Sequence, residues 1–347
     1  MYLVHRYRRT GIYRDARTIH IIHNLGYQGQ FSAARYNSQS LLGLGEVTDL
    51  IKDADLNLCK GAILCADRLV TVSPSYAAEI QSPQGGFGLD DLLVQKARMR
   101  RLVGIRNALD EDWDPKTDKH LARKYDLESF VAGRRECKAA LQKKLGLVIA
   151  PDAVLFGFVG RLTWQKGIDV LTRAISWLLT CGMQGLPGRA QVILMGHGEQ
   201  QYQRLVLDLQ LRNRGVVCGY TGYDPSLEHQ MMAGCDVIVM PSRYEPCGLP
   251  QMAAATYGAL VIATATGGLK DTVKGLEDPN ASGILIQPPL TEFGLRQALR
   301  EAAALYFQKP GRFQQLQRNA MSRSFRWESA VDAYEHQLCL ALAQGTR

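Results

Sequence analysis

The sequence lacks three patterns that would each indicate a class of protein. No apolar run in its 347 residues approaches the roughly 18 that a helix needs to cross a bilayer, so we expect no membrane partner. Its eight cysteines include no C-x-x-C pair, which argues against a zinc site and against a disulfide scaffold. The Walker pattern G-x-x-x-x-G-K-[ST] is also absent, so a P-loop nucleotide site is not expected.

The composition is basic but carries no nucleic-acid signature. The net charge is +8, and the densest basic cluster is Arg98–Arg106. Acidic residues between 110 and 118 follow this cluster directly, and no aromatic residue is interleaved with it. These features favour a solvated face or a site for an anionic small molecule, and we expect no nucleic acid as a partner.

From residue 152 onward, short apolar runs alternate with longer amphipathic segments. Helical patterns, such as 168–179 and 201–211, separate runs that are bounded by glycine or polar turns. This alternation predicts a parallel sheet covered on both faces, in which ligands bind beyond the carboxyl ends of the strands. The predicted strands span residues 154–160, 190–196, 215–220, 235–242, 259–267 and 282–288.

The first part of the chain carries fewer strand signals. Two runs, 18–22 and 67–73, are convincing strands, and a third is expected near 102–105. The charged segment 116–147 is interpreted as a largely helical connection between domains. We therefore predict an α/β protein with domains 1–140 and 141–324, followed by a helix, 325–347, that packs back on the first domain.

Five consecutive strands of the second domain are followed by glycine, charged or aromatic residues. Because the carboxyl ends of parallel strands meet at one edge of a sheet, these residues should lie together and form a site. They are Arg161, Gly196–His197–Gly198, Tyr223, Glu245 and Thr266–Gly267–Gly268.

Two of these strand ends predict an anion site. The turn GRLTWQKG places Arg161 and Lys166 beside the start of a helix, where they suit a diphosphate, although exposed loop charges are the alternative. In ATGGL, Gly267 and Gly268 allow backbone amides to approach an anion closely. The expected ligand is a phosphorylated compound or a nucleotide, held without a metal.

Two more side chains suit a polar ligand. Glu245 lies in PSRYEPCGLPQ, where Pro246 and Pro250 stiffen the turn and aim the carboxylate. His23 lies in TIHIIHNLGYQG, where a strand runs into a polar loop. A helix-capping acid is the alternative interpretation of Glu245.

Several stretches, taken together, resemble one enzyme family. They are IHNLGYQG, ADRLVTVSPSYAAEI, NALDEDWDPKTD, FVGRLTWQKGIDVL, AGCDVIVMPSRYEPCGLPQ and TGGLKDTV, and they cover nearly the whole chain in the family's order. The chain resembles the starch and glycogen synthases, the bacterial and plastid branch of the retaining glycosyltransferases. That family has the GT-B fold, in which two Rossmann-like domains face a cleft. The opening YRRTGIYRDARTIHIIHNL looks most like plant and algal starch synthases.

The resemblance implies that glucose passes from ADP-glucose to the non-reducing end of an α-1,4-glucan with retention of configuration. It implies no metal or other cofactor. It also implies the plastid stroma as location, or the cytoplasm if the chain is bacterial, and starch-synthesis enzyme complexes as candidate partners.

Individual residues take roles from the same resemblance. The cations would neutralise the departing diphosphate, the carboxylate and the imidazole would hold the glucosyl hydroxyls, and a tyrosine would stack on adenine. The residues carried over to catalysis are His23, Arg161, Lys166 and Glu245. Those carried over to substrate and nucleotide binding are Asn107, Tyr223, Cys247, Gly248, Leu249, Thr266, Gly267 and Gly268.

Three departures from the family pattern bear on donor affinity. Asn107-Ala108 replaces Asn-Gly, and alanine would be costly if that backbone needs a positive φ. Trp164 replaces a small polar residue in the phosphate turn. Pro250 and Ala253–Ala255 replace bulkier residues after the glutamate.

A larger departure concerns the start of the chain. The family's Lys-x-Gly-Gly-Leu loop and Asp-Trp-His segment, expected before the histidine loop, are absent. We therefore expect the first strands of the N-terminal sheet to be missing, as in a truncated gene model or a degenerate paralogue. On that interpretation the chain alone would show little transfer and would tend to aggregate. A non-catalytic glucan-binding or complex-forming protein is the alternative, whereas the Glu-Pro-Cys-Gly-Leu sequence disfavours a different GT-B enzyme.

Overall fold

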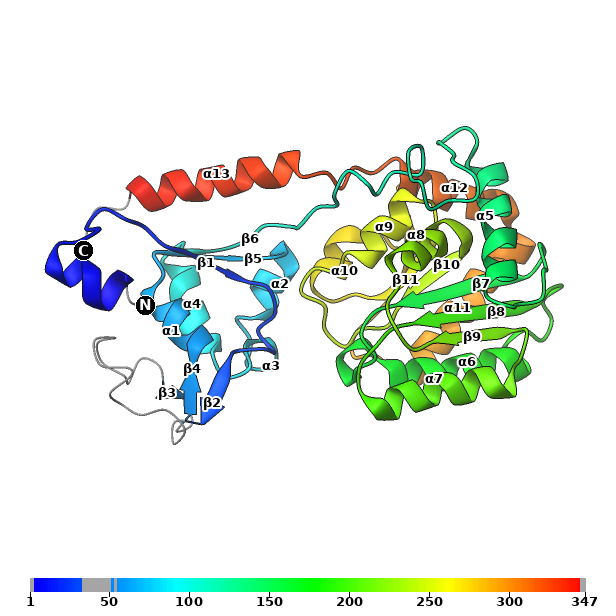
Figure 1. The fold of residues 1–347 in the computed structure, drawn as a ribbon, viewed down its shortest axis with the longest axis horizontal. Coiled ribbons are helices and arrows are strands. Elements are labelled where there is room, and N and C mark those ends of the chain that lie inside the picture. The colour runs from blue at the N-terminus through cyan, green and yellow to red at the C-terminus, as the bar shows by residue number, and fades with distance from the viewer. Residues whose placement is uncertain (1–2, 33–50, 53–54, 344–347) are drawn as a thin grey trace. The chain divides into compact units, whose positions relative to one another are not determined.

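The computed structural model describes residues 3–32, 51–52 and 55–343, and the chain divides into two compact units (Figure 1). Unit 1 combines Met1–Asn107 with Trp327–Arg347, and unit 2 is the continuous segment Ala108–Arg326. Of the three sheets that the described residues form, two lie in unit 1 and one lies in unit 2.

The described part of unit 1 is built on a three-stranded parallel sheet in the order β1-β5-β6. Its strands are β1 (Ile19–Ile22), β5 (Arg68–Thr71) and β6 (Leu102–Gly104), so the three strands predicted for this part of the chain are confirmed. The central strand, β5, is buried along its whole length because both neighbours and the helices cover it. A short antiparallel sheet, β2 (Gln30–Ser32), β4 (Asp55–Asn57) and β3 (Ile51–Lys52), was not predicted from the sequence.

Side-chain caps define where several helices of unit 1 begin. Ser73 accepts a hydrogen bond from the Tyr76 amide (3.1 Å), and Pro74 occupies the first turn of α2. The helical segments before α13 are η1 (Leu3–Tyr7), η2 (Arg8–Thr10), α1 (Leu58–Cys65), α2 (Pro74–Glu79), α3 (Pro83–Gly86) and α4 (Asp90–Arg98).

The C-terminal helix α13 (Glu328–Ala343) belongs to unit 1. Its Ala330 packs in one apolar cluster with Val70 of β5 and Ile105. Arg68 donates from Nε to Oε1 of Gln337 at 2.8 Å, a buried hydrogen bond between the sheet and the helix. The sheet and α13 therefore share a core although they are far apart in the sequence.

Unit 2 contains a six-stranded sheet in the order β12-β11-β10-β7-β8-β9, and every pair in it is parallel. All six predicted strands are confirmed. Residues of β7 and β8 are buried throughout, as expected for strands that helices cover on both faces. The strands are β7 (Val154–Val159), β8 (Ala190–Met195), β9 (Val217–Tyr220), β10 (Val237–Met240), β11 (Leu260–Thr264) and β12 (Gly283–Ile286).

Helices connect these strands and cover both faces of the sheet (Figure 1). α6, α7 and α11 pack together on one side, and α5, α8, α9 and α12 pack on the other. The elements are α5 (Phe130–Lys144), η6 (Trp164–Lys166), α6 (Ile168–Trp177), η7 (Leu178–Gly182), α7 (Gln200–Arg212), α8 (Pro225–Gly234), α9 (Pro250–Thr256), α10 (Gly267–Thr272), α11 (Glu292–Gln308) and α12 (Pro310–Met321).

The expected boundary at residue 140, and the interpretation of 116–147 as a connection, are wrong. The first unit ends at Asn107, and α5 packs on α8 inside unit 2. The buried guanidinium of Arg134 donates to the Met232 carbonyl at 3.1 Å, and Tyr125 donates to the Tyr257 carbonyl at 2.8 Å. The charge of this segment suggested an exposed connection, but one of its cations, Arg134, is buried and donates to backbone carbonyls of the core.

No helix among the described residues is long and apolar enough to span a membrane. Within the same residues, no group of three or more His, Cys, Asp and Glu side chains is arranged to hold a metal ion.

Candidate functional site

The order of the strands in unit 2 reverses between β7 and β10, which are hydrogen-bonded neighbours. In parallel sheets of this kind, ligands bind beyond the carboxyl ends of the strands at the point of reversal. Arg161 and Lys166 follow β7, and Glu245 follows β10. Three of the predicted catalytic residues therefore occupy the switch point of this sheet.

A buried ion pair links the two loops at this point. Lys166 donates from Nζ to Oε2 of Glu245, and Ser242 donates to the same oxygen at 2.9 Å. Glu245 is only 5% exposed, so its carboxylate is fixed in direction by two donors. The helix-capping interpretation of Glu245 is wrong, because α9 begins after Leu249 and has no side-chain cap.

Arg161 is positioned by a glutamine that we did not select from the sequence. Its Nη2 donates to Oε1 of Gln165 at 3.1 Å, and Gln165 donates from Nε2 to the Tyr244 carbonyl at 3.1 Å. The Gln165 side chain is buried, whereas Arg161 is exposed. Gln165 thus connects the arginine after β7 with the loop that carries Glu245. In the sequence, the one indication of this role is that Gln165 is a polar residue in the short turn between Arg161 and Lys166.

Glycines hold the Glu245 loop against the start of α10. The Gly268 amide donates to the Glu245 carbonyl at 3.0 Å, and Gly248 and Gly267 have φ of +73° and +44°. A β-carbon on Gly268 would lie 2.1 Å from the Cys247 carbonyl oxygen. The missing side chain of Gly268 therefore allows two backbone segments to approach closely, whereas the predicted contact of this glycine pair with an anion stays a prediction.

A second glutamine, which we also did not select from the sequence, holds the backbone of this loop by hydrogen bonds. Gln251 donates from Nε2 to the Cys247 carbonyl at 2.9 Å and to the Gly248 carbonyl at 2.8 Å. The same nitrogen lies 3.0 Å from Oγ1 of Thr272 in α10. Gln251 is 1% exposed, so this network lies beneath the loop and fixes its backbone.

Replacing Gly268 by alanine should disturb the fold of this loop. The added β-carbon meets a backbone oxygen, so we expect the free energy of unfolding to fall by about 2–3 kcal/mol, the upper range for overpacking. Gly311→Ala in α12 is the matched control, because nothing lies within 4 Å of its β-carbon position. Urea denaturation of both variants tests this; equal midpoints would contradict the prediction.

The remaining nucleotide-binding candidates in unit 2 differ in exposure. The Tyr223 ring is 65% exposed, and its hydroxyl donates to Oε2 of Glu228 at 2.8 Å. Burial of the hydroxyl and the adjacent Glu228 carboxylate raise the pKa of Tyr223 to about 12. The ring is thus anchored at one end with its faces accessible. Cys247 and Thr266 are buried, and Leu249 is half-exposed.

Two candidates lie in unit 1. His23 is exposed directly after β1, in a loop held by the Leu25 amide, which donates to the Tyr76 hydroxyl at 2.9 Å. Asn107 is the last residue of the first segment of unit 1. The structure therefore brings together Arg161, Lys166 and Glu245 within unit 2, and His23 and Asn107 belong to unit 1.

The alanine after Asn107 carries no backbone strain. Among the described residues, the non-glycine residues with positive φ are Tyr13, Phe87 and Arg100. Ala108 is not one of them, and it is buried. The expected cost of alanine at this position therefore does not arise in this conformation.

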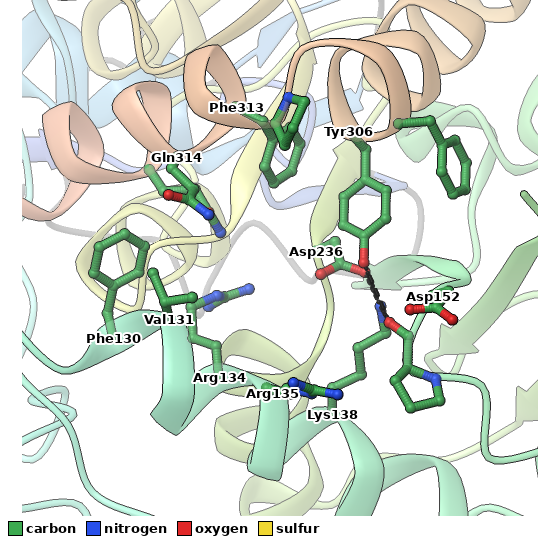
Figure 2. A pocket seen from close by; sticks show the side chains of 14 residues that line it. Phe130, Val131, Arg134, Arg135, Lys138, Asp152, Asp236, Tyr306, Phe313 and Gln314 are labelled. Carbon is green, nitrogen blue, oxygen red and sulfur yellow. Dashed lines mark hydrogen bonds and ion pairs between the residues drawn. The ribbon is translucent and has the colours of Figure 1, made fainter. Parts of the chain in front are cut away.

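A cavity of about 350 Å³ lies at the opposite edge of the same sheet (Figure 2). Asp152 and Asp236, which precede β7 and β10, line it together with residues of α5, α11 and α12. Lys138 pairs with Asp236 here at 2.6 Å and lies 3.2 Å from the Tyr306 hydroxyl. Because ligands of such sheets bind at the carboxyl ends, we do not assign this cavity to the site.

Family models match two parts of the chain. The model described as starch synthase catalytic domain matches residues 1–95, and glycosyl transferases group 1 matches residues 142–319. The second match lies within unit 2 and contains the whole switch-point group.

Curated proteins with similar sequences agree with these models. Soluble starch synthase 1 from Solanum tuberosum is 38% identical over 96% of this chain and 53% of its own length. Glycogen synthase from Myxococcus xanthus is 40% identical over 94% of this chain and 66% of its own. The chain thus spans about half the length of the plant enzymes that it matches.

A solved structure extends the comparison to the fold. The catalytic domain of starch synthase IV from Arabidopsis thaliana, bound to ADP and acarbose, superposes with a TM-score of 0.85. The two chains are 30% identical, and the match covers 97% of this chain and 69% of the other.

Proposed function

Because the chain belongs to the starch and glycogen synthase family, whose members have the GT-B fold, we propose that it is a retaining glucosyltransferase. We propose ADP-glucose as its donor and the non-reducing end of an α-1,4-glucan as its acceptor. The observation that carries the proposal is the Lys166–Glu245–Ser242 group at the switch point of unit 2, with Arg161 and Gly268 beside it. The starch synthase IV structure bound to ADP and acarbose supports both substrate classes.

The proposed mechanism rests on charge stabilisation. When the bond between the glucosyl carbon and the diphosphate breaks, negative charge develops on the leaving phosphate. The cations of Arg161 and Lys166, which the fold fixes before the donor arrives, stabilise that charge. The backbone at the start of α10, at Gly267 and Gly268, lies against the diphosphate, while the Gly268 amide keeps its hydrogen bond to the Glu245 carbonyl.

Glu245 has a different part in this mechanism. Its carboxylate is buried and already accepts two hydrogen bonds, so its direction changes little when a sugar enters. It accepts hydrogen bonds from the glucosyl hydroxyls. Tyr223, whose ring faces are accessible, stacks on the adenine.

The other proposed features follow from the same family. The fixed cations supply the charge that Mg²⁺ supplies in many diphosphate sites, so we propose that transfer needs no metal and is unchanged by a chelator. We propose the plastid stroma as location because the plant relatives are described as chloroplastic or amyloplastic. The bacterial cytoplasm is the alternative that the glycogen synthases support.

Transfer of labelled glucose from ADP-glucose to glycogen tests the activity. The full chain is compared with Glu245→Ala, and unlabelled UDP-glucose serves as competitor. Transfer that disappears in the variant, and that UDP-glucose does not inhibit, supports the proposal. A folded, soluble wild-type chain without transfer removes it and favours a non-catalytic glucan-binding or complex-forming protein.

A further inference from the structure

An exposed tryptophan stands in the turn that carries Arg161 and Lys166. Trp164 is 54% exposed although it opens the short helical turn η6 beside the buried Lys166–Glu245 pair. An exposed indole beside the predicted donor site offers a ligand an apolar face on which to pack. The proposed mechanism assigns this side chain no role.

The ring is held rigidly on one face. The Arg243 guanidinium carbon lies 4.4 Å from the centre of the ring, and Arg243 donates to the Trp164 carbonyl at 2.6 Å. The guanidinium also donates twice to Asp169, both times at 2.8 Å. These hydrogen bonds hold the pKa of Asp169 below its usual range, so its charge persists at neutral pH. Trp164 therefore has one occupied face and one exposed face in a fixed orientation.

From these contacts we propose that Trp164 is a binding platform for a glucosyl ring of the acceptor glucan. This inference rests on the proposed function, and it names a residue that determines acceptor affinity. A sugar ring presents C–H groups on one face and hydroxyls at its rim, so it packs on an aromatic face while its rim stays hydrated.

The other parts of the substrates fit this surface less well. The face of an aromatic ring is electronegative and repels a diphosphate. The Arg243 guanidinium lies against the other face of the ring and donates to Asp169, so it does not meet a ligand on the exposed face. The adenine candidate, Tyr223, follows β9, which lies two strands from β7 and hence roughly 10 Å away along the sheet. The neutral glucan remains as the occupant.

Binding of maltoheptaose to the full chain tests the inference without turnover. We expect Trp164→Ala to raise the dissociation constant by about five- to twentyfold, and Trp164→Phe by less than about threefold. The dissociation constant of ADP should change less than about twofold in both variants. Maltoheptaose should also quench tryptophan fluorescence in the wild-type chain and not in Trp164→Phe, although three of the four tryptophans remain.

Trp177→Ala is the matched control. Trp177 also has an arginine over its ring, Arg296 at 5.3 Å, but it lies at the end of α6, far along the helix from the switch point. We expect this variant to bind maltoheptaose like the wild type.

Three results would overturn the inference: equal maltoheptaose affinity in wild type and Trp164→Ala, a parallel loss of ADP affinity, or no binding by the wild-type chain. If Trp164→Ala folds poorly, the loss of fluorescence quenching in Trp164→Phe still tests the inference. A chain that binds maltoheptaose through Trp164 but transfers no glucose would keep this inference and remove the proposed function.

Discussion

Replacing Lys166 by alanine is expected to lower the rate of glucosyl transfer by about 10²–10³-fold, as for the loss of one fixed donor to a developing anion. The substitution removes a cation that faces the proposed leaving group. Lys166 and Ser242 both donate to the buried Glu245 carboxylate, and the substitution leaves Ser242 alone of these two donors. The rate of transfer to glycogen at saturating ADP-glucose measures the effect.

Two variants make this result specific. Lys166→Arg keeps the positive charge and should recover part of the lost rate, though a guanidinium cannot reproduce the ammonium contact with Oε2 of Glu245. Lys119→Ala removes an exposed lysine of the same unit and should leave the rate unchanged. If Lys166→Ala and Lys119→Ala transferred equally fast, Lys166 would have no part in the chemistry.

Replacing Lys138 by methionine is expected to lower the free energy of unfolding by about 3–5 kcal/mol, the usual cost of removing one partner from a buried pair. The side chains of Lys138 and Asp236 are 5% and 13% exposed, and Asp236 also accepts from the Leu155 amide at 2.8 Å. Without the lysine, the largely buried Asp236 carboxylate before β10 loses its counter-charge. Among the hydrogen bonds of the described residues, it keeps the one from the Leu155 amide.

The pH dependence of this pair has a defined sign. Burial would lower the pKa of Lys138, but attraction to Asp236 and Tyr306 outweighs burial and raises it. A raised pKa in the folded state gives stability that is complete at neutral pH and lost only as the solution becomes alkaline. The difference between wild type and Lys138→Met should therefore shrink at high pH.

Two controls accompany this prediction: a double variant that removes both charges of the pair, and a variant of an exposed ion pair. In the double variant Lys138→Met/Asp236→Asn, the amide oxygen can still accept from Leu155 without a buried charge, so most of the lost stability should return. The Arg123–Glu136 pair is 43% and 56% exposed, and Arg123→Ala should cost less than about 1 kcal/mol. Urea denaturation compares the three variants. A loss in Lys138→Met no larger than in Arg123→Ala would contradict the prediction.

The strands of unit 2 could be predicted because their environment leaves a direct trace in the sequence. Strands covered on both faces, such as β7 and β8, must be apolar at nearly every position, and turn residues interrupt the run where the strand ends. The antiparallel strands β2, β3 and β4 of unit 1 have two or three residues each and no such run, so their pairing is a tertiary property.

The charged residues of the site were predictable for a similar reason, whereas the two glutamines that position them were not. Arg161, Lys166 and Glu245 follow strand ends, and the sheet topology brings the ends together. Gln165 donates to the carbonyl of Tyr244, which is distant in the sequence, and Gln251 donates to the carbonyl of Cys247 beneath the loop. Glutamine is common in helices and turns, so only the folded backbone distinguishes these two from the others.

Unit 1 is built from two separated segments of the chain, and this affects how the chain folds during synthesis. Unit 2, Ala108–Arg326, is continuous and is synthesised entirely before α13. Unit 1 obtains the Ala330 contact and the Gln337 hydrogen bond only when this last helix emerges. Domains are usually completed in the order of translation. Here the later segment is complete first, and the nascent β1-β5-β6 sheet waits for a helix encoded more than 200 residues after β6.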